Sequence, residues 1–247
     1  MTGTTPNVDT IIQGDCLEEM KKLDPGIFDC VITDPPYSSG TRKEGSKGIR
    51  KSMCRAVDDG DWIASDCLTT NGFTWLMRNC AVEWKRVLKP GGHVLCFIDW
   101  RMYSVLSGAI ESADLRNQAM IIWNKTFFGM GTHFRNQHEI ILHFTKGMGS
   151  EAQRHDIGNV ISIPPIRGGV HPTEKPVELI EKLISVVVPP EGIILDPFIG
   201  SGTTAVAARR TGKHFVGIEQ EPAYCEIARK RVAAVPARLD RWAEAAI

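Results

Sequence analysis

The tetrapeptide Asp34-Pro35-Pro36-Tyr37 brings together a carboxylate, backbone carbonyls and an aromatic ring. It follows the apolar, β-prone run 28–33, so we predict that it lies at the end of a buried strand. Proline fixes φ and has no N–H, so Pro35 and Pro36 present acceptors on a stiff frame. This set of groups suits a planar base that carries an amino group. An isolated match is also typical of a proline-rich turn, so the interpretation depends on a second motif.

The second motif runs from Ile193 to Thr204, where an apolar strand meets a glycine-rich turn and a predicted helix. Glycine lets the backbone approach a ligand closely, and the free N–H groups at a helix start favour polar or anionic groups. The next predicted strand ends at Glu219, close to the ~20-residue offset after Asp196 at which an acid meets ribose hydroxyls in nucleotide-binding units. The turn is neither a Gly-x-Gly-x-x-Gly fingerprint nor a Walker loop, which disfavours a dinucleotide. The alternative is an ordinary βα turn.

Together the two motifs resemble those of the DNA amino-methyltransferases, which use S-adenosylmethionine. Two further segments fit this family, His-Pro-Thr-Glu-Lys-Pro at 171–176 and Gly-Asp-Cys at 14–16. The tetrapeptide precedes the glycine-rich turn, an order that resembles the permuted beta class of these enzymes. Methyltransferases of rRNA and of proteins with a similar tetrapeptide usually have the opposite order. The resemblance extends from about Ile11 to about Val232.

The resemblance implies a role for each motif. Asp34 and the Pro35 carbonyl would accept hydrogen bonds from the exocyclic amino group of a flipped adenine, and Tyr37 would stack on the base. Rigidity would come from Pro36 as well as Pro35. The implied cofactor-binding residues are Asp196, Phe198, Gly200, Ser201, Gly202 and Thr203 around the cofactor, Glu219 at its ribose, Asp15 and the main chain of Cys16 at its adenine, and His171, Thr173, Lys175 and Asp34 at its methionine end.

The expected product is N6-methyladenine in duplex DNA. In the family, Asp-Pro-Pro-Tyr occurs mostly with adenine and Ser-Pro-Pro-Tyr mostly with N4-cytosine, so methylation of cytosine at N4 is the nearest alternative. A permuted family of RNA adenine methyltransferases uses a related tetrapeptide that ends in tryptophan. Because this chain has Tyr37 at that position, methylation of RNA is disfavoured. A catalytically idle module that binds the cofactor or a nucleic acid is a further alternative, disfavoured by the intact Asp34 and Tyr37.

Length and composition are those of an ordinary globular protein. The 247 residues suit a single α/β methyltransferase domain that spans 1–247. Hydrophobic residues make up 43% and charged residues 23%, and the formal net charge is zero. A DNA-binding protein that is strongly basic overall would usually show an excess of Lys and Arg, so contact with double-stranded DNA must be local.

The cysteines, histidines and apolar segments indicate where the protein is located and whether it binds a metal. Seven cysteines without a Cys-x-x-Cys pair favour a reduced, cytoplasmic protein with neither a disulfide framework nor a zinc site. The seven histidines show no metal-ligand spacing, so we expect no metal. The polar N-terminus is unlike a signal peptide, and the longest apolar stretch is broken by Pro189-Pro190, so we expect no association with a membrane.

Strands and helices are predicted to alternate along the chain. The predicted strands are 9–13, 29–33, 93–98, 118–123, 139–144, 192–195 and 214–218, and the predicted helices are 17–23, 72–88, 102–113, 176–186, 203–211 and 221–234. This order predicts a mostly parallel, Rossmann-like sheet covered on both faces. No long helix separates 118–123 from 139–144, so these strands should form an antiparallel edge hairpin. Asp34, Asp196 and Glu219 all follow strands, and ligands of such sheets bind beyond the strands' carboxyl ends.

Two segments lie outside this alternation. The segment 38–62 is long and polar and carries Arg42, Lys43, Lys47, Arg50, Lys51 and Arg55. We expect a flexible basic arm that contacts DNA phosphates, and a merely solvated loop is the alternative. The resemblance places target recognition in the second segment, at about 145–170. Because this segment is short, recognition of the DNA sequence would be shared with the arm or with a second subunit of a homodimer.

Overall fold

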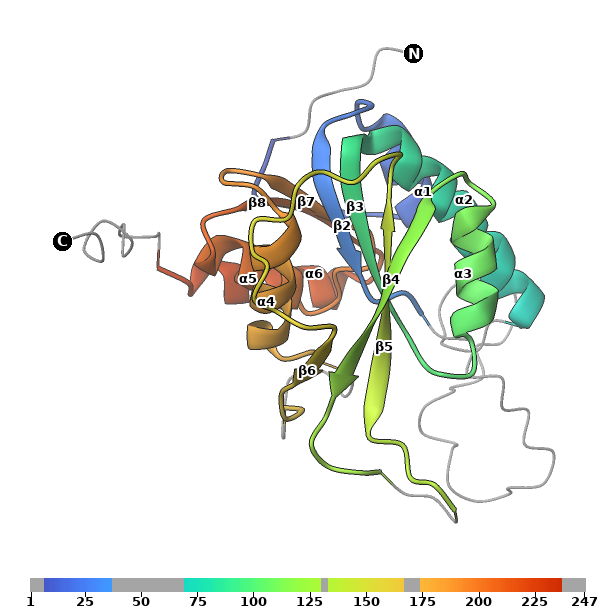
Figure 1. The fold of residues 1–247 in the computed structure, drawn as a ribbon. Helices are drawn as coiled ribbons and strands as arrows, with labels where there is room; N and C mark the ends of the chain where they lie inside the picture. The colour runs from blue at the N-terminus through green and yellow to red at the C-terminus, as the bar shows by residue number, and fades with distance from the viewer. Residues whose placement is uncertain (1–6, 37–68, 130–132, 167–173, 237–247) are drawn as a thin grey trace, which may run out of the picture.

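The computed structural model describes residues 7–36, 69–129, 133–166 and 174–236. Over these residues one eight-stranded sheet lies between two layers of helices (Figure 1). In chain order the elements are β1 (Thr10–Gln13), α1 (Cys16–Lys22), β2 (Phe28–Thr33), α2 (Thr70–Val87), β3 (Leu88–Ile98), α3 (Tyr103–Glu111), β4 (Arg116–Asn124), β5 (His138–Thr145), β6 (Val160–Ser162), α4 (Val177–Val187), β7 (Ile193–Asp196), α5 (Thr203–Arg210), β8 (His214–Glu219) and α6 (Pro222–Ala233).

The strand order across the sheet is β1-β8-β7-β2-β3-β5-β4-β6. All neighbouring strands are parallel except at β5, which runs antiparallel to both β3 and β4. The mostly parallel sheet and the antiparallel hairpin of β4 and β5 are therefore confirmed. The sequence pattern did not predict β6, a three-residue strand that pairs with β4 and lies outside the hairpin at the edge of the sheet.

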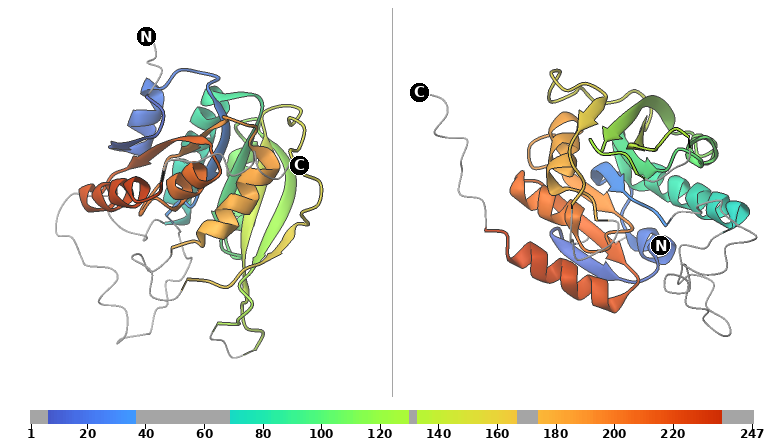
Figure 2. Two further views of the ribbon diagram at one scale, coloured as in Figure 1. Left: turned by 90° about the vertical axis from the view of Figure 1, so that its left-hand side faces the viewer. Right: turned by 90° about the horizontal axis from the view of Figure 1, so that it is seen from below.

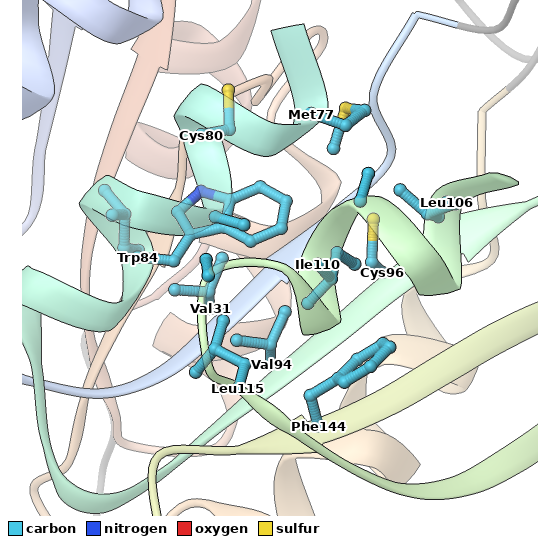
Figure 3. Packing of buried hydrophobic residues seen from close by; sticks show 14 of the residues in the cluster. Val31, Met77, Cys80, Trp84, Val94, Cys96, Leu106, Ile110, Leu115 and Phe144 are labelled. Carbon is cyan, nitrogen blue, oxygen red and sulfur yellow. The ribbon is translucent and has the colours of Figure 1, made fainter. Parts of the chain in front are cut away.

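The two faces of the sheet bury two hydrophobic clusters, one under α1, α2 and α3 and the other under α4, α5 and α6. The view from below in Figure 2 shows these two helical layers on opposite sides of the sheet. Along β2, Val31 belongs to the first cluster, whereas Cys30 and Ile32 belong to the second. This alternation follows from the period of two in a strand. Figure 3 shows the first cluster, where Trp84 of α2 packs over Val31.

The predicted helices are observed with ends that differ by at most two residues. The largest difference in a strand is at β3, which begins at Leu88 rather than His93. Residues 89–92, Lys-Pro-Gly-Gly, fall between the predicted helix 72–88 and the predicted strand 93–98. In the structure they lie within β3 as an irregularity, because Leu88 already pairs with Phe28 and the register shifts before His93 pairs with Cys30. Gly91 has φ +79°, which the irregular backbone requires.

The described residues offer neither a membrane span nor a metal cluster. No helix among them is long and apolar enough to cross a membrane. They also contain no group of three His, Cys, Asp or Glu side chains placed to hold a metal ion.

Candidate active site

The tetrapeptide and the glycine-rich turn meet at the carboxyl ends of two neighbouring strands. β2 pairs in parallel with β7 through Cys30–Ile194 and Val31–Leu195, so both strands end at the same edge of the sheet. The Thr33 hydroxyl donates a 2.9 Å hydrogen bond to Asp196 Oδ1 across this pair. Two motifs more than 160 residues apart in the sequence are thereby joined directly.

Asp34, the first residue of the tetrapeptide, forms an ion pair with Lys175. Lys175 is 7% exposed, and its Nζ donates to Asp34 Oδ2. The same Nζ lies 3.3 Å from Glu139 Oε2 and 5.3 Å from the centroid of the Phe97 ring. Burial disfavours the charged amine, but the Asp34 and Glu139 carboxylates outweigh it and raise the pKa of Lys175. Lys175 is therefore a buried cation held between two carboxylates.

Glu139 connects this ion pair to the β4–β5 hairpin. It lies at the start of β5, and its Oε1 accepts a hydrogen bond from Lys125, which follows β4. Burial favours the neutral acid, yet Lys175 and Lys125 hold the pKa of Glu139 below its usual value. The Lys125 ammonium also lies 4.9 Å from the centroid of the Trp123 ring. Asp34, Lys175, Glu139 and Lys125 thus form a row of alternating charges.

Sequence analysis did not identify Glu139 or Lys125 as site residues. A signal for them was present, because each is a charged residue at the end of an apolar hairpin strand. β5 is antiparallel to its neighbours, so its first residues lie at the same edge as the last residues of the parallel strands. Recognising this required the direction of β5 and its place next to β3.

Asp196 organises the start of the glycine-rich turn. Its carboxylate is 4% exposed and accepts hydrogen bonds from the Thr33 hydroxyl, from the Phe198 N–H at 3.1 Å and from the Thr204 hydroxyl. Burial raises the pKa of Asp196 to about 7, although these donors favour the charged form. The hydrogen bonds to Asp196 hold the start of the turn in place. The half-buried ring of Phe198 packs against the first hydrophobic cluster.

The turn itself depends on two glycines in the left-handed region, Gly200 with φ +50° and Gly202 with φ +88°. A Cβ at Gly202 would lie 2.8 Å from the Cβ of Ala228 on α6, so the turn packs directly against that helix. A Cβ at Gly200 would meet nothing within 4 Å, so this side of the turn faces open space. Gly202 precedes α5, and Thr203 begins that helix as a buried residue. The backbone is thus shaped to approach a ligand at the helix start.

Glu219 is the last residue of β8, the strand next to β7, and therefore lies at the same edge of the sheet. Its Oε2 accepts a 2.9 Å hydrogen bond from Gly200 N–H, and its Oε1 accepts one of 2.9 Å from Glu221 N–H. These two amides fix the carboxylate next to the glycine-rich turn. A carboxylate has about four lone pairs, so acceptor capacity remains for a pair of hydroxyl groups.

Arg231 connects Ser201 of the turn to the segment that carries Lys175. Its Oγ and its carbonyl oxygen accept hydrogen bonds of 2.7 and 2.9 Å from Arg231 Nη1 on α6. Arg231 Nη2 donates to Glu174, the residue before Lys175. Arg231 was not identified from the sequence, because its role depends on where α6 packs.

The Gly-Asp-Cys segment is also brought to this edge. Gly14 N–H donates to the Glu219 carbonyl at 2.9 Å, because β1 pairs with β8. The Asp15 side chain accepts from Leu17 N–H and from the next amide, and it therefore caps α1. The Cys16 side chain is buried in the first cluster.

The structure therefore brings together Asp34, Lys175, the glycine-rich turn and Glu219. Pro35 is buried and Pro36 is half-buried. Four of the expectations lie outside the described residues, namely Tyr37, His171, Thr173 and the basic arm 38–62. The recognition segment at about 145–170 is described only up to residue 166, and the part that is described contains β6.

The chain matches the sequence profile of a family described as DNA methylase, of the N6 and N4 type, over residues 28–160 and 149–230. It is 30% identical over 232 residues to YubD of Escherichia coli (strain K12), covering 94% of this chain and 93% of that one.

Two solved structures share the fold. The M1.HpyAVI–SAM complex has a TM-score of 0.67 at 23% identity, and the match covers 90% of this chain and 98% of that one. The PvuII DNA methyltransferase, a cytosine-N4-specific enzyme, has a TM-score of 0.70 at 17% identity, with coverage of 92% and 87%. At these identities the similarity demonstrates a common architecture.

Proposed function

This chain belongs to the N6/N4 DNA methylase family, and from that premise we propose that it transfers a methyl group from S-adenosylmethionine to the exocyclic N6 of adenine in duplex DNA. One observation carries the proposal. The strand that ends in Asp34-Pro35-Pro36 lies next to the strand that ends in the glycine-rich turn, and the Thr33–Asp196 hydrogen bond joins them. A base held by the first motif is therefore adjacent to a ligand held by the second.

The residues of the turn fit S-adenosylmethionine. Glu219 is an acid fixed by two backbone amides beside Gly200, which suits a ribose with two hydroxyl donors. The open space at Gly200 lets the backbone approach a ligand, and Asp34, at the end of the neighbouring strand β2, offers a carboxylate to an ammonium group. When bound, the cofactor supplies an electrophilic methyl group on a positively charged sulfur.

Asp34 and the Pro35 carbonyl perform the part of the reaction that the protein can influence most. The exocyclic amino nitrogen of adenine is a poor nucleophile because its lone pair is delocalised into the ring. Two acceptors on its two hydrogens favour a tetrahedral nitrogen with a localised lone pair. The same acceptors stabilise the positive charge that develops on the nitrogen as the methyl group is transferred. No covalent intermediate with the protein is needed.

The target base must leave the DNA helix to reach these groups, at a cost of about a few kcal/mol for unstacking. Tyr37 would stack on the base once it is extruded, and the basic arm at 38–62 would hold the adjacent phosphates. We favour adenine over cytosine because Asp-Pro-Pro-Tyr, the tetrapeptide of this chain, occurs in the family mostly with adenine. The fold shared with a cytosine-N4-specific enzyme makes N4-methylcytosine the alternative that the test must distinguish.

The test is methyl transfer by the purified protein. Tritiated S-adenosylmethionine is incubated with unmethylated duplex DNA or with RNA, and the label in each polymer is counted. The labelled DNA is then digested to nucleosides to show which base carries the label, and label in deoxycytidine alone would contradict adenine as the target. Asp34→Asn removes the charge of the catalytic carboxylate, whereas Asp114→Asn makes the same change at an exposed site. We expect label in DNA for the wild type and for Asp114→Asn, and a loss of about 100-fold or more for Asp34→Asn. Label only in RNA, or full activity of Asp34→Asn, would contradict the proposal.

A further inference from the structure

Glu139 faces the catalytic carboxylate across Lys175. The Lys175 ammonium pairs with Asp34 on one side and lies 3.3 Å from Glu139 Oε2 on the other. Lys175 and Glu139 have side chains that are 7% and 19% exposed, so water screens this row of charges poorly. The charge next to the reacting nitrogen is therefore set by the whole row and not by Asp34 alone.

The reaction makes the balance of this row important. As the N–C bond forms and the C–S bond of the methyl donor breaks, the C–S electron pair stays on the sulfur, which leaves as a neutral thioether. The positive charge passes to the target nitrogen, which afterwards releases a proton to solvent. Asp34 attracts this charge, and a bare lysine ammonium beside Asp34 would repel it. Lys175 cannot simply be neutral, because its two carboxylate partners raise its pKa. A second carboxylate behind Lys175 offsets the repulsion.

We propose that Glu139 is a positioning residue for methyl transfer, which holds Lys175 in place and offsets its charge beside Asp34. This inference rests on the proposed function, because it concerns the charge that develops on the target nitrogen. Glu139 acts through Lys175 and Asp34. It comes from β5, so the hairpin strand, which carries none of the recognised motifs, completes the electrostatics of the site.

Lys125 provides a way to separate charge from structure. It donates to Glu139 Oε1 on the side away from Lys175, so it is the fourth charge in the row. Removing Glu139 alone leaves one excess positive charge in the row. Removing Glu139 and Lys125 together restores the original net charge, although it removes one more hydrogen-bonding partner.

The two explanations of Glu139 therefore make opposite predictions for the double variant. If Glu139 acts by its charge, adding Lys125→Met to Glu139→Gln recovers part of the lost rate. If Glu139 only connects the hairpin to Lys175 by hydrogen bonds, Lys125→Met removes a further contact and lowers the rate again. Glu139→Asp keeps the charge, so it should retain more activity than Glu139→Gln.

The experiment compares these variants at saturating DNA and cofactor. Cofactor affinity is measured by calorimetry and folding by thermal unfolding, and Glu226→Gln, an exposed residue on α6, is the matched control. We expect Glu139→Gln to lower kcat about tenfold or more, with the dissociation constant for S-adenosylmethionine within about threefold of the wild type. The double variant should then regain about threefold or more in kcat.

Three results would overturn the inference. These are a kcat for Glu139→Gln within about twofold of the wild type, a double variant slower than Glu139→Gln, or an equal loss in Glu139→Asp and Glu139→Gln. A wild-type protein that transfers no methyl group to DNA would instead contradict the proposed function. An active wild type with an unaffected Glu139→Gln variant would contradict only the inference about Glu139.

Discussion

Replacing Gly202 with alanine would place a methyl group where the cofactor turn packs against α6. The new Cβ would lie 2.8 Å from the Cβ and 3.0 Å from the Cα of Ala228. The second of these atoms is backbone that belongs to a helix, so it cannot swing away as the end of a long side chain could. The residue also has φ +88°, which side-chain-bearing residues rarely adopt.

Two costs add at Gly202. The left-handed conformation costs about 1–2 kcal/mol for a residue with a Cβ. Overpacking against a fixed neighbour costs about 1–3 kcal/mol more. The expected loss in the free energy of unfolding is thus about 2–5 kcal/mol, which for a protein of this size lowers Tm by about 4–20 °C. The displaced turn should also bind S-adenosylmethionine more weakly.

Two other glycines serve as controls in the same thermal unfolding assay. Gly200→Ala meets nothing within 4 Å but keeps φ +50°, so only the conformational cost of about 1–2 kcal/mol applies. Gly108 lies inside α3 with nothing within 4 Å of its Cβ position, so alanine there should stabilise the protein by about 0.4–1 kcal/mol. The predicted order of stability is Gly108→Ala above the wild type, then Gly200→Ala, then Gly202→Ala.

A different order of stability would contradict the packing of the turn against α6. A Gly202→Ala protein as stable as the wild type would mean that the turn does not pack against Ala228 as observed. A Gly200→Ala protein less stable than Gly202→Ala would mean that strain, rather than contact with α6, dominates the turn.

Three further predictions concern the site and the arm. Glu219→Ala should weaken S-adenosylmethionine binding about ten- to a hundred-fold, because hydrogen bonds to a charged group contribute about 1.5–3 kcal/mol; unchanged affinity by calorimetry would mean that Glu219 does not reach the ribose. The pKa of Asp196 is raised from 3.8 to about 7, so between these pH values the folded protein holds a proton that the unfolded chain has released. The contribution of Asp196 to the free energy of unfolding is therefore present below pH about 4 and is lost as the pH rises to about 7. Asp196→Asn should remove this slope from the unfolding free energy, and a variant with the wild-type slope would exclude Asp196 as its source. Replacing Arg50 and Lys51 with alanine should weaken duplex binding and lower the log–log salt slope by about 0.9 for each phosphate that the arm no longer neutralises, with cofactor affinity unchanged; wild-type affinity and slope would make the arm a solvated loop.

The arrangement of the sheet could be predicted from the sequence because hydrophobic period and turn residues define it locally. The runs at β2, β7 and β8 are short, apolar and followed by proline, glycine or acid, so both their type and their carboxyl ends were evident. β6 was missed because three residues are too few to show a period. The start of β3 was missed because Pro90 and Gly91 usually mark a turn, and pairing with β2 overrides that preference.

The site was predictable where one motif carries its own chemistry. Asp34, Asp196 and Glu219 lie at strand ends, and the parallel direction of their strands brings them to one edge. Residues that act through a long-range contact could not be predicted in this way. Glu139 and Arg231 reach the site only because β5 lies next to β3 and α6 packs against the glycine-rich turn. The sequence shows Glu139 only as a charged residue at the end of an apolar strand, and it does not show which residues Glu139 and Arg231 contact.

We propose that this chain methylates adenine in DNA, with the carboxylate of Asp34 next to the cofactor turn. This proposal is tested most directly by incubating unmethylated plasmid DNA with the protein and S-adenosylmethionine, digesting the DNA to nucleosides, and identifying the methylated nucleoside by chromatography and mass spectrometry. We predict N6-methyldeoxyadenosine, absent when the Asp34→Asn protein is used. N4-methyldeoxycytidine as the sole product, or no methylated nucleoside in DNA at all, would contradict the account.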